Sequence, residues 1–237
     1  MPALDDRTLR VMTYNLRGLR QEVDALVAVV RAVGPDVLAV QEPPRGPLGR
    51  RRLRAFAART GLRVAVGGGG ARTTALLVAP HRAVRDARAL RLPWRFGLTR
   101  RGVSTARVDG VRVAVVHLGL RADERARHVD LLVRRLVAAQ AGGSPVLVAG
   151  DLNERPGGPS WLALHGVGDG LQDAAVAGGD ERPTYPADAP RLRIDAVLAD
   201  RRLAVQAARV PDEAAVGVAS DHRPLVVDLA LPGRSRG

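Results

Sequence analysis

The feature that most constrains the fold of this chain is a series of short apolar runs, rich in Val, Leu and Ala, that alternate with turns and helical patterns. Runs of this length are typical of buried β-strands. We predict strands over Leu9–Leu16, Asp36–Gln41, Leu62–Val66, Thr73–Ala79, Val84–Leu90, Val103–Val108, Val111–His117, Pro145–Ala149, Ile194–Ala199, Leu203–Val210 and Leu225–Leu231. Strands this apolar need cover on both faces, which requires a layered α/β architecture.

Helices are predicted where apolar residues recur at helical spacing, and turns where glycine, proline or aspartate interrupt the pattern. The predicted helices are Val23–Val33, Arg50–Thr60, Asp123–Ala141 and Ser160–Leu164. Asp109-Gly110 predicts a hairpin, Leu171–Pro190 a long loop, and Pro232–Gly237 a frayed tail. Because no break in composition marks a linker, we predict one domain over residues 1–237, with its core at about 8–231.

The composition describes an ordinary globular protein and limits the kinds of metal site. Of 237 residues, 46% are hydrophobic and 26% charged, which is enough for one large α/β domain. The absence of cysteine excludes disulfides and thiolate sites. A metal would therefore be held by carboxylates, amides or histidines, which favours Mg²⁺ or Mn²⁺ over structural zinc.

The net charge is +13, and all 37 basic residues are arginines. Two interpretations stay open, a coding bias toward GC-rich codons and a polyanionic partner that arginine binds through paired contacts. The runs Arg50–Arg52 and Arg100-Arg101, with Arg54, could bind extra phosphates, but we interpret them as solvated faces. Aromatic residues make up 3%, which argues against a binder of single strands built on stacking.

The N-terminal residues 1–16 contain early acids and no long apolar stretch, which does not fit a secretory signal. We find no segment of about 20 apolar residues, the length that a membrane span requires. We therefore expect a cytoplasmic protein without a transmembrane segment, and a monomer.

Polar residues stand where predicted strands end, and in α/β folds such positions build sites. They are Asn15, Glu42, His117, Asp151, Asn153, Asp195 and the pair Asp221-His222. Taken singly, most have an ordinary structural explanation, since asparagine and aspartate are common in caps and turns. Asp195 is harder to explain in that way, because an unpaired carboxylate within a strand is costly.

The ordered motifs TYN, QE, HLGL, GDLN, RIDAVL and SDHRPL, from Asn15 to His222, together resemble the endonuclease/exonuclease/phosphatase superfamily of DNase I-like phosphoesterases. The resemblance implies a four-layer α/β/β/α sandwich of two packed mixed β-sheets. It also implies hydrolysis of phosphoester bonds by water that a divalent metal ion, Mg²⁺ or Mn²⁺, activates.

The resemblance further implies the roles of the metal and water ligands. Glu42 would be the principal metal ligand with Asn15 beside it, and Asp221 would lie in the metal or water shell. Asp151 would orient or deprotonate the attacking water near the metal, and Asn153 would position that water or a phosphate oxygen.

The two histidines would contact the phosphate. His117 would donate a hydrogen bond to a non-bridging oxygen, and Asp195 would orient His222 toward the scissile group. We therefore predict a hydrogen bond between Asp195 and His222, 27 positions apart in the sequence. Arg17 stands where abasic-site-repair endonucleases carry aspartate, which weakens that particular assignment.

The substrate stays open among DNA, RNA, a phospholipid headgroup and a small phosphoester. The alternative class of function is a non-catalytic basic module that binds nucleic acid or another polyanion. A pure binder needs arginines and gains nothing from a buried set of acids that repel phosphate, so the acids favour the enzyme.

Overall fold

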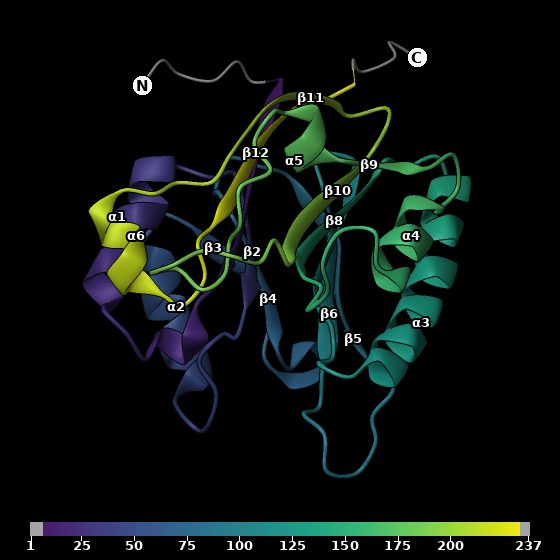
Figure 1. Cartoon of the computed structure of the whole chain (residues 1–237). Coiled ribbons are helices and arrows are strands. Elements are labelled where there is room, and N and C mark those ends of the chain that lie inside the picture. Colours follow the sequence, from purple (N-terminus) through teal and green to yellow (C-terminus); the bar gives the residue numbers. More distant parts are fainter. Residues whose placement is uncertain (1–6, 233–237) are drawn as a thin grey trace.

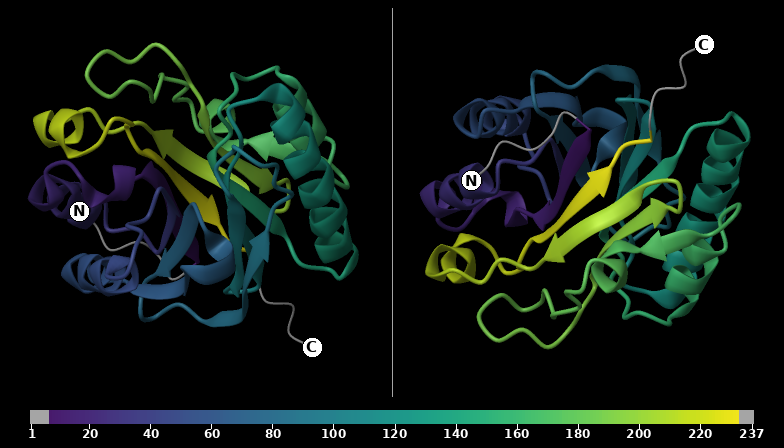
Figure 2. Two further views of the ribbon diagram at one scale, coloured as in Figure 1. Left: turned by 90° about the horizontal axis from the view of Figure 1, so that it is seen from below. Right: turned by 90° about the horizontal axis from the view of Figure 1, so that it is seen from above.

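Two six-stranded mixed β-sheets pack face to face in the computed structural model, which describes residues 7–232 (Figure 1). Helices cover the outer face of each sheet, as the end-on views show (Figure 2). This is the predicted four-layer α/β/β/α sandwich. The tail Pro232–Gly237 was predicted to be frayed. Its residues from 233 onward lie outside the described residues.

The first sheet has the strand order β11-β12-β1-β2-β4-β3. Its strands are β1 (Thr8–Asn15), β2 (Val37–Gln41), β3 (Arg63–Gly67), β4 (Thr74–Val78), β11 (Ala204–Arg209) and β12 (Leu225–Ala230). Its outer side carries α1 (Val23–Val33), α2 (Gly49–Arg59) and α6 (Ala214–Ala219) (Figure 1). Two 3₁₀ turns, η1 (Arg17–Leu19) and η2 (Gly69–Ala71), follow β1 and β3.

The second sheet has the order β5-β6-β7-β8-β10-β9. Its strands are β5 (Val84–Arg91), β6 (Gly102–Val108), β7 (Val111–His117), β8 (Val146–Asp151), β9 (Leu171–Asp173) and β10 (Asp195–Asp200). The helices α3 (Ala122–Ala141) and α4 (Pro159–His165) cover its outer face, and α5 (Ala174–Ala177) packs near β10 and β11 (Figure 1).

The core has three apolar layers because both faces of the central strands are buried. In β1, Val11 packs between the sheets, whereas Met12 and Tyr14 pack toward the helices of the first sheet. The inter-sheet layer includes Val113 and Leu147 from the second sheet, both with no exposed surface. This double burial explains why the strands read as apolar runs without polar alternation.

The structure differs from the predicted elements in two places. The segment Leu171–Pro190, predicted as a loop, contains β9 and α5, and α6 was not predicted at all. β9 and α5 have three and four residues, which is too short for a periodic pattern. α6 has six residues and contains Gly217, a poor helix former. None of the helices in the described part of the chain combines the length and hydropathy that a membrane span requires.

Candidate active site

Three of the predicted residues form one row across the second sheet. His117 of β7 pairs in register with Asp151 of β8, and Asp151 pairs with Asp195 of β10. Neighbours in such a row project from the same face of a sheet, a few ångströms apart. Strand register therefore brings together one histidine and two carboxylates that are far apart in the sequence.

The first sheet contributes the opposite wall. Asn15, at the end of β1, is paired with Gln41 of β2, so Glu42 follows beside it. Glu42 has a left-handed backbone with φ of 50°, and its N–H donates to the Thr73 carbonyl over 3.0 Å. Its carboxylate makes no hydrogen bond or ion pair with any residue of the described chain. The backbone thus positions a partly exposed carboxylate that has no protein partner.

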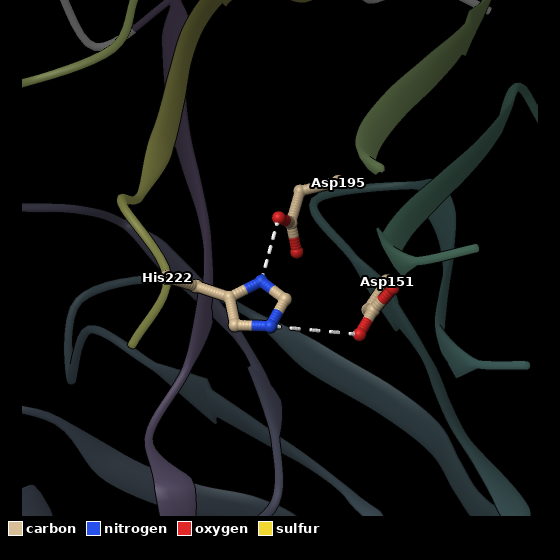
Figure 3. Close-up of side chains that lie close together, drawn as sticks. All are labelled: Asp151, Asp195 and His222. Carbon is tan, nitrogen blue, oxygen red and sulfur yellow. Dashed lines mark hydrogen bonds and ion pairs between the residues drawn. The ribbon is translucent and has the colours of Figure 1, made fainter. Parts of the chain in front are cut away.

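Asp195 and His222 form the predicted contact. Nδ1 of His222 donates to Oδ2 of Asp195 over 2.9 Å (Figure 3). The hydroxyl of Thr184 donates to the same oxygen over 2.6 Å, and the Tyr185 ring lies 4.7 Å from the imidazole, centroid to centroid. These contacts fix both the carboxylate and the plane of the imidazole ring.

The charge of His222 follows from its neighbours. Burial lowers its pKa. The carboxylates of Asp195, Asp151 and Asp221, of which Asp195 has the largest effect, outweigh burial and raise the pKa to about 9. His222 is therefore an imidazolium at neutral pH. Its Nε2 lies 4.0 Å from Oδ2 of Asp151, so the unbonded side of the ring faces the second carboxylate (Figure 3).

Asp151 is buried among charged groups at the end of β8. Burial and the nearby Asp195 raise its pKa to about 7, against the lowering effect of His222. The backbone N–H of Asn153 donates to Oδ1 over 2.8 Å, while Oδ2 lies 3.6 Å from Nε2 of His117. A carboxyl group with this pKa changes protonation state near neutrality, as a general base requires.

His117 is buried beside Arg101, and the Asn153 side chain is held by a backbone hydrogen bond. Burial and the positive charge of Arg101 hold the pKa of His117 well below its usual range, so its ring is neutral. The Asn153 amide donates to the Leu118 carbonyl over 2.9 Å. Asp221 is tied to the neighbouring Arg17, whose Nε lies 3.3 Å from its Oδ2.

These side chains line one cavity of about 660 Å³ at the ends of both sheets. The predicted residues on its wall are Asn15, Glu42, His117, Asp151, Asn153, Asp221 and His222. Asp195 is not on the wall and acts from behind His222. All the predicted residues therefore lie at one place, and Asp195 reaches the cavity only through the imidazole.

Three residues at the site were not predicted from the sequence. Thr184 and Tyr185 lie in the segment that was predicted to be a loop. Arg101 was interpreted as solvated, which is wrong, because it is only 7% exposed and donates from Nη1 to the His117 carbonyl over 3.3 Å. Its burial lowers its pKa. None of the three carries a local signal, because only the tertiary fold brings them against Asp195 and the histidines.

Two groups of donors could hold a cation. Asp151, Asp195 and His222 offer ligand atoms within 4.8 Å of one another. In that group the hydrogen bond between Asp195 and His222 occupies Oδ2 and Nδ1, and protonation of His222 opposes coordination through its other nitrogen. The Glu42 side fits better, because a partnerless carboxylate lies there beside the Asn15 amide. Oxygen donors of this kind suit a hard divalent ion.

The profile of the Endonuclease/Exonuclease/phosphatase family matches residues 12–222. The chain belongs to this family. Its members hydrolyse phosphoester bonds. Curated proteins give no sequence match.

Solved structures share the fold of this endonuclease/exonuclease/phosphatase family member at low sequence identity. The family protein from Bacteroides vulgatus has a TM-score of 0.78 at 16% identity and covers 94% of this chain and 99% of its own. The family protein from Beutenbergia cavernae has 0.70 at 24%, covering 98% of this chain and 73% of its own. The mannosyl-6-phosphatase Bt3783 from Bacteroides thetaiotaomicron has 0.78 at 16%, covering 93% and 99%.

Proposed function

We propose that this chain hydrolyses a phosphoester bond by direct attack of water, with a divalent cation bound beside Glu42. The observation that carries the proposal is the hydrogen bond of 2.9 Å between Asp195 and His222, with Asp151 facing the other side of the imidazole. This arrangement places the positively charged imidazole of His222 next to Asp151, whose carboxyl group titrates near neutral pH.

His222 binds and stabilises the phosphate. As an imidazolium with one nitrogen held by Asp195, it presents its second N–H to an anionic oxygen in the cavity. A preoriented charged donor stabilises the charge that develops in the transition state, and it needs no rearrangement during the reaction. Asp195 is a positioning residue in this scheme, and Thr184 orients its carboxylate.

Asp151 receives the proton of the attacking water. In its ionised form it has one oxygen held by the Asn153 N–H, which leaves Oδ2 on the side of the two histidines. The neutral His117 ring serves as a hydrogen-bond donor to a non-bridging oxygen. Because no nucleophilic serine or cysteine is needed, the reaction proceeds without a covalent enzyme intermediate.

Glu42, Asn15, Asp221 and Asp151 would hold the cation, which we propose to be Mg²⁺ or Mn²⁺. Once bound, it supplies positive charge that neutralises the phosphoryl oxygens. The Glu42 carboxylate is the donor best suited to this task, because no described residue competes for it.

The substrate is a phosphoester. The structural neighbours include a mannosyl-6-phosphatase from Bacteroides thetaiotaomicron and TDP2 from Caenorhabditis elegans. The alternative, a basic module without activity, gains support from the many arginines. It gives no reason for burying Asp151 and Asp195 in a row, since acids repel a bound polyanion.

The test is a hydrolysis assay with plasmid DNA, bis-(p-nitrophenyl) phosphate and p-nitrophenyl phosphate, with and without Mg²⁺ or Mn²⁺. We expect activity that EDTA abolishes and excess metal restores. Glu42→Gln should lower activity by about 100-fold or more, because it removes the main cation ligand. Glu22→Gln, which changes the same charge outside the cavity, should have no effect.

Activity that survives rigorous chelation would contradict the proposed requirement for a metal ion. Tight binding of DNA with no hydrolysis of any of the three substrates would favour the basic module instead.

A further inference from the structure

A second pocket of about 380 Å³ adjoins the active-site cavity. The two share Pro43, Arg45 and Thr99 in their walls, so they form one continuous depression. A ligand bound at the His222 end can therefore extend into the second pocket without crossing a wall. Arg45 lies at the junction of the two.

Four arginines line this pocket: Arg45, Arg50, Arg72 and Arg100. No residue of the described chain forms an ion pair with any of them, and the wall contains no carboxylate. Many other arginines of this protein are paired, as Arg125 is with Glu154 at 3.0 Å. Four unpaired guanidinium groups around one hollow raise its positive potential, and an anion from outside the chain would lower it.

Part of the wall is glycine backbone. Gly68 and Gly69 have φ of 70° and 46°, and Arg50 lies against them. A Cβ at Gly68 would stand 2.8 Å from Nε of Arg50, so a side chain there would displace the guanidinium. The absence of side chains at these glycines leaves room for the Arg50 guanidinium and for a ligand. Arg100 is also held, because its guanidinium stacks on Trp94 with 4.2 Å to the ring centroid.

The pocket also receives the N-terminus of α2 through Gly49 and Arg50. The N-cap residue Leu48 offers no side-chain acceptor, and the first turn carries no acid. The N-terminal end of a helix carries partial positive charge, which adds to the field of the arginines. Side chains and helix therefore favour the same kind of ligand, one rich in anionic oxygens.

We propose that this pocket binds a second phosphate group of the substrate, so that the enzyme prefers molecules with another phosphate close to the scissile one. The inference rests on the proposed function in taking His222 as the place of the scissile phosphate. Guanidinium groups pair with phosphate through two parallel hydrogen bonds, so the pocket suits a phosphate better than a neutral group. A second phosphate can come from a small bisphosphate or from the next link of a nucleic-acid strand.

Calorimetry in EDTA measures binding without turnover and separates this inference from catalysis. The first arm compares adenosine 3′,5′-bisphosphate with adenosine 5′-monophosphate, and the second compares d(pApA) with d(ApA). In at least one arm we expect wild-type protein to prefer the probe with the second phosphate by about tenfold or more, the scale of a lost charged hydrogen bond.

The variant Arg50→Gln/Arg72→Gln should reduce that preference to less than about threefold. Arg54→Gln is the matched control, because Arg54 lies exposed on the same helix and lines neither pocket. Thermal melts verify folding, and Arg50→Gln alone replaces the double variant if that variant does not fold. Preference in only the first arm assigns the pocket to small bisphosphates, and preference in the second assigns it to nucleic-acid strands.

Equal affinity of wild-type protein for both members of each pair overturns the inference, even if hydrolysis is observed. An unchanged preference in the double variant also overturns it. If the preference and its dependence on arginine are present but no substrate is cleaved, the proposed function fails and the phosphate pocket stands.

Discussion

At Asp195 and His222, two side chains 27 positions apart in the sequence meet over a hydrogen bond of 2.9 Å. Asp195→Asn should lower turnover by about tenfold or more, because the amide leaves the imidazole misoriented. His222→Ala should be at least as severe. The double variant should lose far less than the product of the two losses, since residues that act as a unit are not additive.

Single-turnover kinetics on the best substrate of the assay measure these losses. If the two losses multiply in the double variant, Asp195 does not act through His222, and its carboxylate has a structural role alone.

The charge of His222 can be measured directly by NMR. In protein treated with EDTA, its imidazole should titrate with a pKa of about 9. Asp195→Asn should lower that pKa, because burial then acts with less opposition and favours the neutral ring. Asp130→Asn, on the exposed side of α3, should leave the value unchanged. An ordinary pKa near that of a free histidine in wild-type protein would remove the basis for a cationic phosphate contact.

At the scale of the elements, the central strands could be predicted because their burial on both faces leaves an apolar signature. The helix Val23–Val33 and the strand Val111–His117 have the predicted bounds. The row of His117, Asp151 and Asp195 could not be derived from the residues, since register depends on pairing between distant strands. Their positions at predicted strands pointed to a site, but only the family resemblance implied their roles.

The burial of Arg101 escaped prediction for a related reason. Adjacent arginines look alike in a sequence, but here Arg100 is exposed on Trp94 and Arg101 is buried beside His117. The contact of Thr184 with Asp195 also depends on tertiary structure, because a segment with mixed Gly and Pro shows no period that places its side chains.

Gly150 allows β7 and β8 to approach at the site. It has φ of 150°, and a Cβ there would lie 2.0 Å from the Val116 carbonyl oxygen. We expect Gly150→Ala to lower the free energy of unfolding by about 2–4 kcal/mol. Gly217→Ala is the control, because its Cβ would meet nothing within 4 Å. That change should raise stability by about 0.5–1 kcal/mol through helix propensity. Urea denaturation measures both, and an unaffected Gly150→Ala protein would contradict the packing.

At the scale of the molecule, the inter-sheet layer joins both halves of the chain. Because residues of both sheets pack there, we expect residues 7–232 to unfold in one step, which is the physical content of the single-domain prediction. Fluorescence of Trp94 and Trp161 and far-UV circular dichroism should give coincident transitions in urea. Leu147→Ala should lower the free energy of unfolding by about 2–5 kcal/mol and shift both transitions together. Separate transitions would show that the sheets are independent units.

The two ends of the described chain lie side by side at the top of Figure 1, where the Leu231 N–H donates to the Arg7 carbonyl over 2.8 Å. β1 and β12 are antiparallel neighbours, so these ends lie away from Asn15. A short linker between residues 7 and 231 would have to span only the distance between two neighbouring strands, about 5 Å. The chain could then be circularly permuted and reopened at Gly143, where a Cβ would meet nothing within 4 Å. Such a permutant would keep every cavity residue on an uninterrupted strand or loop, which makes chain order and site geometry separable properties of this protein.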